Sequence, residues 1–148
     1  MKFDLSNVVM SYVDKRIKLV LPERPSEELA ELIGALPGDV YVGSSRGYHH
    51  EIRIAGHIED DPPYLIYLGS LIAFLFNIRM SLIKRDEINT AYLLKRSKGM
   101  LSFLKTIGYS KKRGIIKIPN WIWKEKKFSI NFIRGLFDTD GCMRFNKG

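Results

Sequence analysis

The fold of this chain is decided by the stretch Ile133-Arg134-Gly135-Leu136-Phe137-Asp138-Thr139-Asp140-Gly141, because its frame also occurs 101 residues earlier. The earlier copy is Leu32-Ile33-Gly34-Ala35-Leu36-Pro37-Gly38-Asp39-Val40. In both copies apolar residues surround a glycine, and five positions separate that glycine from an aspartate. A glycine inside a helix costs about 1 kcal/mol relative to alanine, so Gly34 and Gly135 predict a close contact between two helices.

Two helices packed through these glycines would bring together the aspartates at their C-terminal ends, Asp39 and Asp140. An aspartate there meets the negative end of the helix dipole, at a cost of about 0.3 to 1 kcal/mol, and a second carboxylate adds repulsion. Divalent cations relieve both effects, and Mg²⁺ takes carboxylate, water and phosphate oxygens, as in two-metal phosphodiester hydrolysis. We therefore interpret the pair as a metal site, although either aspartate alone would be an ordinary helix-terminal residue.

The residues between the two copies alternate between helical and strand patterns. From residue 27 the order is helix, hairpin, helix, hairpin, helix and a second helix resembling the first, which predicts an α+β fold with a duplicated unit whose second copy is cut short. The expected elements are helices over 7–18, 27–36, 63–76 and 100–107, hairpins over 39–55 and 79–96, an extended segment over 115–119 and a helix starting near Ser129. Ser26 and Ser129 are the candidate N-caps of their helices.

Positive charge is concentrated in one part of the chain. Residues 1 to 78 hold 7 Lys/Arg and 11 Asp/Glu, whereas residues 79 to 127 hold 14 Lys/Arg and 3 Asp/Glu. Such a basic block attracts polyanions, and nucleic acid is favoured over a membrane surface because each neutralised phosphate also releases counterions. A solvated lysine-rich face is the alternative on charge alone.

Composition excludes several classes of protein. With 148 residues, 45% of them apolar and 27% charged, the chain has the makeup of one globular domain with a core, and disorder does not fit. Cys142 is the only cysteine and the start of the chain is polar, so we expect no internal disulfide and no signal peptide. The longest apolar run, 64–78, is too short and interrupted to span a bilayer. We expect a cytoplasmic, nucleoid-associated protein, with an organelle left open and no membrane partner.

The motif Phe132-Ile133-Arg134-Gly135-Leu136-Phe137-Asp138-Thr139-Asp140-Gly141 resembles the second motif of two-repeat, archaeal-type LAGLIDADG homing endonucleases. The approach Ile118-Pro119-Asn120-Trp121-Ile122 resembles the segment that leads into that motif. The likeness covers about residues 26 to 148 and includes the element order, which in the family is αββαββα per repeat. It implies an N-terminal helix and linker over 1–25, a first repeat over 26–128, and the start of a truncated second repeat over 129–148.

The resemblance implies a site-specific endonuclease that hydrolyses double-stranded DNA with Mg²⁺, Mn²⁺ being a substitute. Asp39 and Asp140 would then coordinate the metals, Gly34 and Gly135 would pack the motif helices, and a catalytic lysine falls on Lys112, with Lys111 the alternative. The hairpins would form a saddle whose side chains enter the major groove. The basic residues assigned to DNA contact are Arg46, Arg53, Lys84, Arg85, Lys95, Arg96, Lys111 and Arg113.

The sequence departs from the family pattern in two ways. Val40 stands where the family usually has glycine, with Pro37 in the last helical turn, and only eight residues follow Asp140. Three explanations stay open: a fragment of a longer frame, which we favour, a remnant that binds without cutting, or a homodimer that rebuilds the saddle. The rival function is a non-cleaving nucleic-acid binder, such as an RNA maturase acting on intron RNA or a regulator.

Other patterns are given simpler interpretations. His49 and His50 lack further ligands at metal-binding spacing, so a zinc or HNH-nuclease site is disfavoured. Trp121 and Trp123 are interpreted as packing residues in preference to base-stacking ones. An intein is disfavoured because the chain has no nucleophile at its start and no His-Asn at its end.

Overall fold

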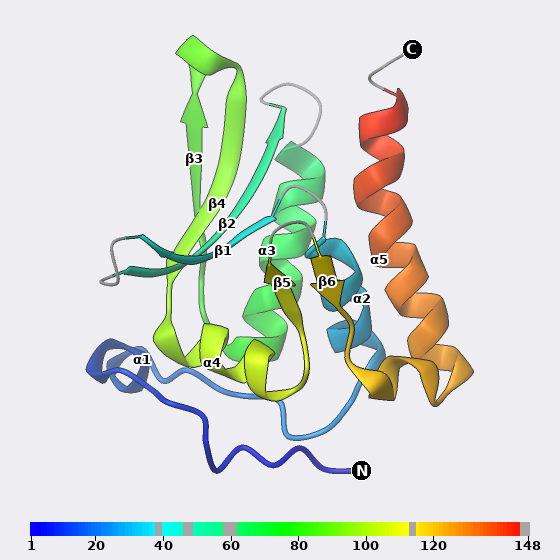
Figure 1. The fold of residues 1–148 in the computed structure, drawn as a ribbon. Helices are drawn as coiled ribbons and strands as arrows, with labels where there is room; N and C mark the ends of the chain where they lie inside the picture. The colour runs from blue at the N-terminus through cyan, green and yellow to red at the C-terminus, as the bar shows by residue number, and fades with distance from the viewer. Residues whose placement is uncertain (38–39, 46–48, 58–61, 113–114, 146–148) are drawn as a thin grey trace.

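The computed structural model describes residues 1–37, 40–45, 49–57, 62–112 and 115–145 (Figure 1). The α-helices are α1 Tyr12–Arg16, α2 Glu27–Ala35, α3 Pro62–Phe76, α4 Lys98–Thr106 and α5 Lys126–Phe145. The strands are β1 Val40–Ser45, β2 His49–His57, β3 Ser81–Arg85, β4 Thr90–Arg96, β5 Ser110–Lys112 and β6 Ile115–Lys117. Two short 3-10 helices are η1 Asp86–Ile88 and η2 Asn120–Trp123. The α+β class and the order of helices and hairpins from residue 27 are confirmed.

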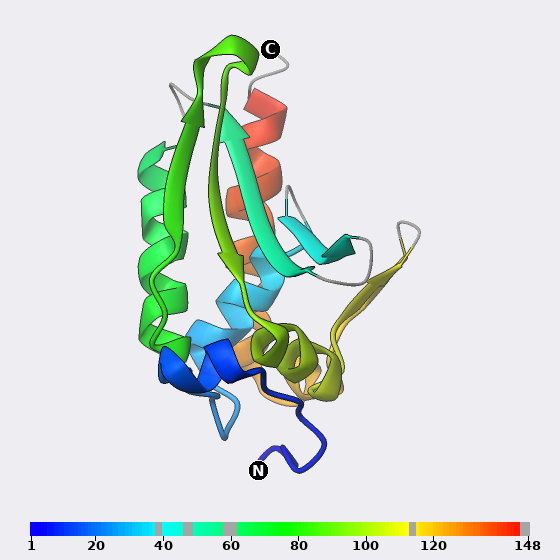
Figure 2. The same cartoon turned by 90° about the vertical axis from the view of Figure 1, so that its left-hand side faces the viewer.

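The two hairpins join into one antiparallel sheet of four strands in the order β1-β2-β4-β3. Strand β2 pairs with β4 through seven registered positions from Glu51↔Arg96 to His57↔Thr90, so the central pair of strands comes from different hairpins. A separate two-stranded ribbon, β5 and β6, lies beside the sheet (Figure 1). The sheet presents one open face, while α3 and α5 lie behind it (Figure 2).

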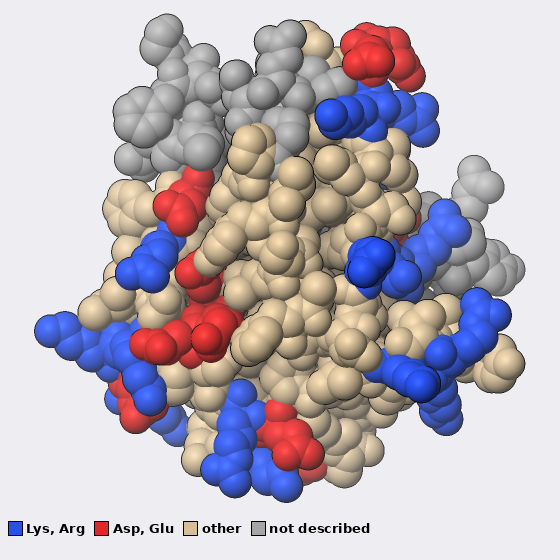
Figure 3. Space-filling model, turned by 180° about the vertical axis from the view of Figure 1, so that it is seen from behind, with Lys and Arg blue, Asp and Glu red and all other residues tan. Residues whose placement is uncertain are grey.

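The core lies between the covered face of the sheet and the helices. Ile52 and Ile54 of β2 and Leu93 of β4 are buried on that face, as the alternation of a half-buried strand predicts. Helix α3 contains no charged residue along its 15 positions. Seen from behind, charged side chains surround a broad uncharged band that coincides with α3 (Figure 3). None of the helices in the described ranges has both the length and the apolar character needed to cross a membrane.

Helix α2 forms where the sequence predicted it. The Ser26 hydroxyl accepts a hydrogen bond from the backbone N–H of Leu29, which is the N-cap interaction expected of this serine. Two acidic residues lie in the first turn, where their negative charge interacts favourably with the positive end of the helix dipole. Every residue from Leu29 to Ala35 is buried, so α2 is the central helix of the core.

The N-terminal helix is shorter than predicted. The apolar pattern predicted a helix over 7–18, but α1 spans only Tyr12–Arg16. It begins there because Ser11 and Asp14 form a capping box, and it ends before Lys18, which has a positive φ of 60°.

Asp14 also ties this N-terminal segment to α4. Its buried carboxylate accepts hydrogen bonds from the Ser97 hydroxyl at 2.7 Å and from the Gly99 backbone N–H at 2.8 Å. Ser97 in turn caps α4 by accepting from the N–H of Met100 at 3.1 Å. One carboxylate therefore completes the N-terminal turns of two helices.

Helix α5 begins three residues earlier than predicted. The sequence favoured Ser129 as its N-cap, whereas the helix starts at Lys126, directly after η2. The Ser129 hydroxyl instead donates to the carbonyl oxygen of Ile122 at 2.7 Å, which ties the first turn of α5 to η2. Trp121 packs its ring edge-on against Phe128, with ring centroids 5.3 Å apart, and this contact fixes the direction in which α5 leaves η2.

Candidate nucleic-acid interface and metal site

Helices α2 and α5 pack against each other through the two motif glycines. A Cβ atom added to Gly34 would lie 2.0 Å from the carbonyl oxygen of Phe132, and one added to Gly135 would lie 2.1 Å from the carbonyl oxygen of Glu31. Because these obstacles are backbone atoms, only glycine permits this approach at either position.

The contact between the two glycines is reciprocal. Gly34 faces the backbone of Phe132 and Leu136, whereas Gly135 faces the backbone of Glu31 and Ala35. Phe132 and Leu136 lie 101 positions after Glu31 and Ala35, the same offset that separates the two motifs. The two helices therefore run parallel and in register, related by an approximate two-fold axis (Figure 1).

The two predicted metal ligands are not fully covered by the structure. Asp39 lies outside the described residues, and the side chain of Asp140 is likewise outside them, although its backbone belongs to α5. Helix α5 continues past Asp140 to Phe145, so the prediction that this aspartate ends its helix is wrong. Among the residues that are described, no cluster of three or more His, Cys, Asp or Glu side chains is arranged to hold a metal ion. The structure does show that α2 and α5 cross in parallel, so their C-terminal ends point in the same direction.

One basic side chain lies at the C-terminal end of α2. The Lys111 ammonium is 3.5 Å from the carbonyl oxygen of Pro37, to which it donates. In the β5–β6 ribbon Lys111 pairs with Ile116, which packs against the core, and Lys112 pairs with Ile115, which is 74% exposed. Paired residues share a face, so Lys111 is on the side of the ribbon facing the protein body. The side chain of Lys112 lies outside the described part of the chain.

Three of the predicted DNA-contacting residues share the open face of the sheet. Arg53 of β2 is opposite Leu94, Arg96 of β4 is opposite Glu51, and Arg85 of β3 is opposite Thr90. Because side chains alternate along each strand, these arginines lie on the face away from Ile52 and Leu93.

Two residues that the sequence reasoning missed organise these arginines. The Arg53 guanidinium donates from Nε and Nη2 to the buried Glu51 carboxylate, at 2.9 and 2.6 Å, and lies 5.6 Å from the centre of the Tyr92 ring. A hydrogen bond with Tyr92 raises the pKa of Arg85, with the nearby Glu87 acting in the same direction. Tyr92 could be found only from the register, because it belongs to the strand next to that of Arg53, whereas Glu51 lies two residues before Arg53 on the same strand and therefore on the same face.

The remaining predicted contacts are placed differently. Lys84 is opposite Ala91 and Lys95 is opposite Ile52, and both of those partners are fully buried. The two lysines therefore occupy positions on the covered face, at strand ends where Lys84 is exposed and Lys95 half-buried. Arg46 and Arg113 lie outside the described residues.

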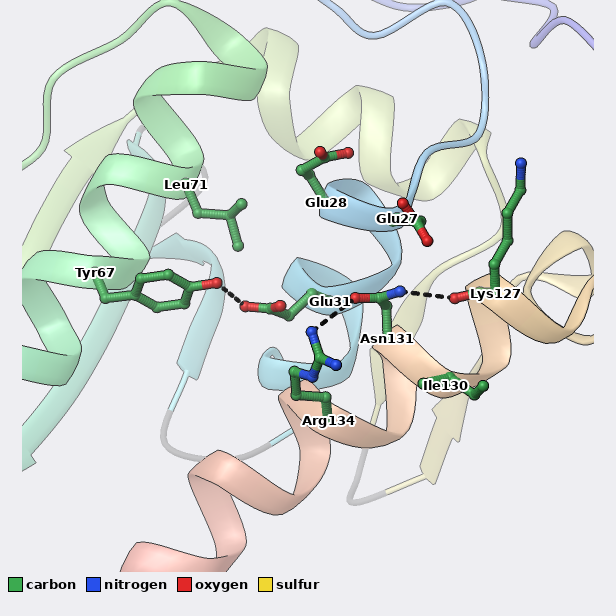
Figure 4. A pocket seen from close by; sticks show the side chains of 9 residues that line it. All are labelled: Glu27, Glu28, Glu31, Tyr67, Leu71, Lys127, Ile130, Asn131 and Arg134. Atoms are coloured by element: carbon green, nitrogen blue, oxygen red, sulfur yellow. Dashed lines mark hydrogen bonds between the residues drawn. The ribbon is translucent and has the colours of Figure 1, made fainter.

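A cavity of about 490 Å³ opens between α2, α3 and α5 (Figure 4). Within it the Tyr67 hydroxyl donates to the Glu31 carboxylate, and this hydrogen bond is the main cause that raises the pKa of Tyr67 to about 12. Arg134 points toward Glu31 and donates to Asn131, whereas Lys127 extends away from them (Figure 4). This cavity lies beside the first half of α2, away from the aspartate ends of the motifs.

The fold established by these elements is that of a LAGLIDADG homing endonuclease. Among solved structures, the chain matches mesophilic variants of the homing endonuclease I-DmoI with a TM-score of 0.53 and 19% identity, over 76% of this chain and 56% of that one. The chain thus spans little more than half the length of that protein.

Two further I-DmoI structures, both described as complexes with target DNA in the presence of Mn, match with a TM-score of 0.48. Their identities are 19% and 18%, over 76% of this chain and 60% and 59% of those chains. No protein-family model matches the sequence, and no curated protein matches it.

Proposed function

We propose that this chain is part of a site-specific DNA endonuclease that hydrolyses phosphodiester bonds with divalent metal ions. The observation that carries the proposal is the reciprocal contact of Gly34 and Gly135. Since the two helices are parallel and in register, we expect the positions five residues beyond each glycine to be equivalent by the two-fold relation. Asp39 and Asp140 occupy those positions in the sequence.

The donor set suits Mg²⁺. Two carboxylates, together with water and phosphate oxygens, match the ligands of this hard cation, and its charge would offset the repulsion between them. When bound, the metal ions would activate water and stabilise charge on the phosphate. Of the two candidate lysines, we assign the supporting role to Lys111, because its ammonium already lies at Pro37, two residues before Asp39.

The open face of the sheet is the proposed DNA-binding surface. Arg53, Arg85 and Arg96 share this face, and Arg53 is held in a fixed orientation by Glu51 and Tyr92. Fixed arginine side chains on a sheet suit contacts with phosphates and with guanine edges in the major groove.

We also propose that a second unit covers α5. Ile130, Ile133 and Phe137 are 46%, 43% and 61% exposed, whereas their equivalents 101 residues earlier in α2 are completely buried. Those equivalents are Leu29, Leu32 and Leu36. The two-fold relation between the helices predicts that α5 needs the same kind of cover that the sheet and α3 give to α2. In this proposal residues 26–128 form the first repeat, and 129–148 begin the second.

The experiment measures metal binding and DNA cleavage for Asp140→Asn. Calorimetric titration with Mn²⁺ should show loss of a bound ion, and Mg²⁺-dependent cleavage of DNA selected from a random duplex library should disappear while binding persists. Asp138→Asn is the matched control, since it makes the same charge change two residues earlier on α5. If Asp140→Asn retains both the metal and the cleavage activity, the proposed site is wrong.

The same titrations discriminate the rival function. A chain that binds nucleic acid without metal-dependent cleavage, and prefers folded intron RNA to duplex DNA in competition, would be a maturase-like or regulatory binder.

A further inference from the structure

A second cavity, of about 390 Å³, lies where the segment before α2 meets η2 and the first turn of α5. Its apolar wall includes Pro25, Trp121 and Phe128. The N-terminal segment and the start of α5 lie at the end of the molecule opposite the C-terminus of α5 (Figure 1). The cavity is about 20 Å along α5 from Asp140, since a helix rises about 1.5 Å per residue. It is therefore separate from the proposed metal site.

The charged side chains around this cavity are mostly cationic. Arg24, Lys124 and Lys127 line it together with a single carboxylate, Glu125. Within the described ranges, none of these four side chains makes an ion pair. The Lys127 ammonium lies 5.2 Å from the centre of the Phe128 ring, which belongs to the cavity wall. Three cations against one carboxylate give the cavity an excess of positive charge that no side chain of the described residues neutralises.

Helix α5 adds to this positive potential. The cavity is lined by Lys124 and Glu125, which immediately precede α5, and by Lys127 and Phe128 in its first turn. The first N–H groups of a helix have no acceptor within the helix, and its dipole places partial positive charge there. Because α5 has 20 residues, its dipole is fully developed.

Trp121 is a fixed part of the apolar wall of this cavity. The residue is 2% exposed, and its indole Nε1–H is buried without an acceptor among the described residues. Its ring is held by Phe3 and Phe128, with centroids 5.8 and 5.3 Å away, so the indole is fixed in the cavity wall.

We propose that this cavity binds the phosphate group of a small organic phosphate. A phosphate offers several acceptor oxygens to a guanidinium fork, to two ammonium groups and to the helix N-terminus at once. The apolar wall would contact the organic part, and the volume falls within the range of about 300 to 1,000 Å³ typical of small-molecule sites. This function goes beyond DNA cleavage, because it uses neither the open face of the sheet nor the motif aspartates.

Binding is tested with adenosine monophosphate as the probe, on the full chain. The protein has two tryptophans, so Trp123→Phe leaves Trp121 as the only source of indole fluorescence. Adenosine monophosphate should change this emission saturably and release or take up heat in calorimetry, whereas adenosine should do neither. Equal binding of adenosine and its monophosphate would overturn the proposal, as would the absence of binding at millimolar concentration.

Matched charge variants separate a site from general electrostatic attraction. Arg24→Gln with Lys124→Gln should weaken adenosine monophosphate binding at least tenfold. Lys126→Gln is the control, because Lys126 is exposed in the same helical turn and does not line the cavity. Similar weakening in the double variant and in Lys126→Gln would refute a defined site.

The source of the phosphate is decided by competition. If a short DNA duplex displaces adenosine monophosphate from the Trp123→Phe protein, the same chemistry is supplied by a nucleic-acid backbone. If the duplex and the nucleotide bind together, the natural ligand is a free organic phosphate. Either result, combined with sensitivity to Arg24 and Lys124, supports the phosphate site. Loss of metal binding in Asp140→Asn should leave nucleotide binding intact, so the two proposals fail independently.

Discussion

Replacing Gly34 by alanine should destabilise the protein by about 2 kcal/mol. The new Cβ would lie 2.0 Å from the carbonyl oxygen of Phe132 and 2.9 Å from its carbonyl carbon. Non-bonded heavy atoms prefer separations of about 3.5 Å, so α2 and α5 must move apart by more than about 1 Å. Overpacking of this kind costs about 1 to 3 kcal/mol, and the upper end applies because backbone atoms cannot rotate away. Alanine recovers about 1 kcal/mol through its higher helix propensity.

The measurement is urea unfolding of the full chain followed by far-UV circular dichroism. Gly69→Ala is the matched control, because it makes the same change inside α3, where the added Cβ would meet only Leu93 side-chain carbons at 3.5 and 3.7 Å. It should stabilise the protein by up to about 1 kcal/mol. The reasoning about the helix crossing is refuted if Gly34→Ala is as stable as Gly69→Ala.

The reciprocal contact leads to a second prediction, which concerns Gly135→Ala and the double variant. Gly135→Ala should cost about as much as Gly34→Ala, because its Cβ would lie 2.1 Å from the carbonyl oxygen of Glu31. The double variant should cost less than the sum of the two, because one separation of the helices relieves both clashes. Additive costs would mean that the two glycines act at independent places.

Three further predictions follow from the side-chain contacts. Asp14→Asn should destabilise the protein by about 2 kcal/mol at pH 7. Burial raises the pKa of Asp14, but hydrogen bonds from Ser97, Ser11 and Gly99 outweigh it and hold the pKa below its usual value. The stabilisation should therefore be complete above about pH 4 and shrink as the pH falls further, and a difference that grows on acidification in unfolding titrations would contradict this. Tyr67→Phe should cost about 1 kcal/mol by removing the donor to Glu31, and this contribution in the wild type should persist at pH 10 and disappear as the pH rises through about 12. Alkaline absorbance titration should show Tyr67 and Tyr109 ionising late, near pH 12, and the substitution should remove one of these two late steps. Arg53→Gln and Arg96→Gln should each lower the salt dependence of DNA binding by about one unit of slope, whereas Lys126→Gln should leave it unchanged.

Local pattern was sufficient to predict most of the fold. The alternation around Ile52 and Ile54 identified β2, Ser26 identified the start of α2, and the two glycines identified the helices that meet. These signals are local in sequence, or depend on one repeated frame, so they can be recognised without coordinates. The N-terminal helix was overestimated because it begins only at the capping box of Ser11 and Asp14, and the Asp14 carboxylate is also held by Ser97 and Gly99, more than 80 residues away.

Less of the candidate site could be predicted from the sequence. Basic residues in the hairpins were easily found in the sequence. Which face of the sheet each of them lies on depends on strand register, which puts Arg53 on the open face and Lys95 on the covered face. The distinction between Lys111 and Lys112 likewise depends on which of them pairs with Ile116 across the β5–β6 ribbon. Nothing in the sequence marked Glu51 or Tyr92 as functional, because each acts only by holding an arginine on the same or a neighbouring strand.

The crossing of α2 and α5 also affects folding during synthesis on the ribosome, because α2 is translated well before α5. Its two sides are separated by 101 residues of chain, which at about 5 to 20 residues per second take roughly 5 to 20 seconds to translate. During that interval the glycine face of α2 has no partner, even after α3 and the sheet have been made and can cover its other sides. A nascent chain should therefore remain sensitive to proteases and chaperones at α2 until α5 leaves the exit tunnel.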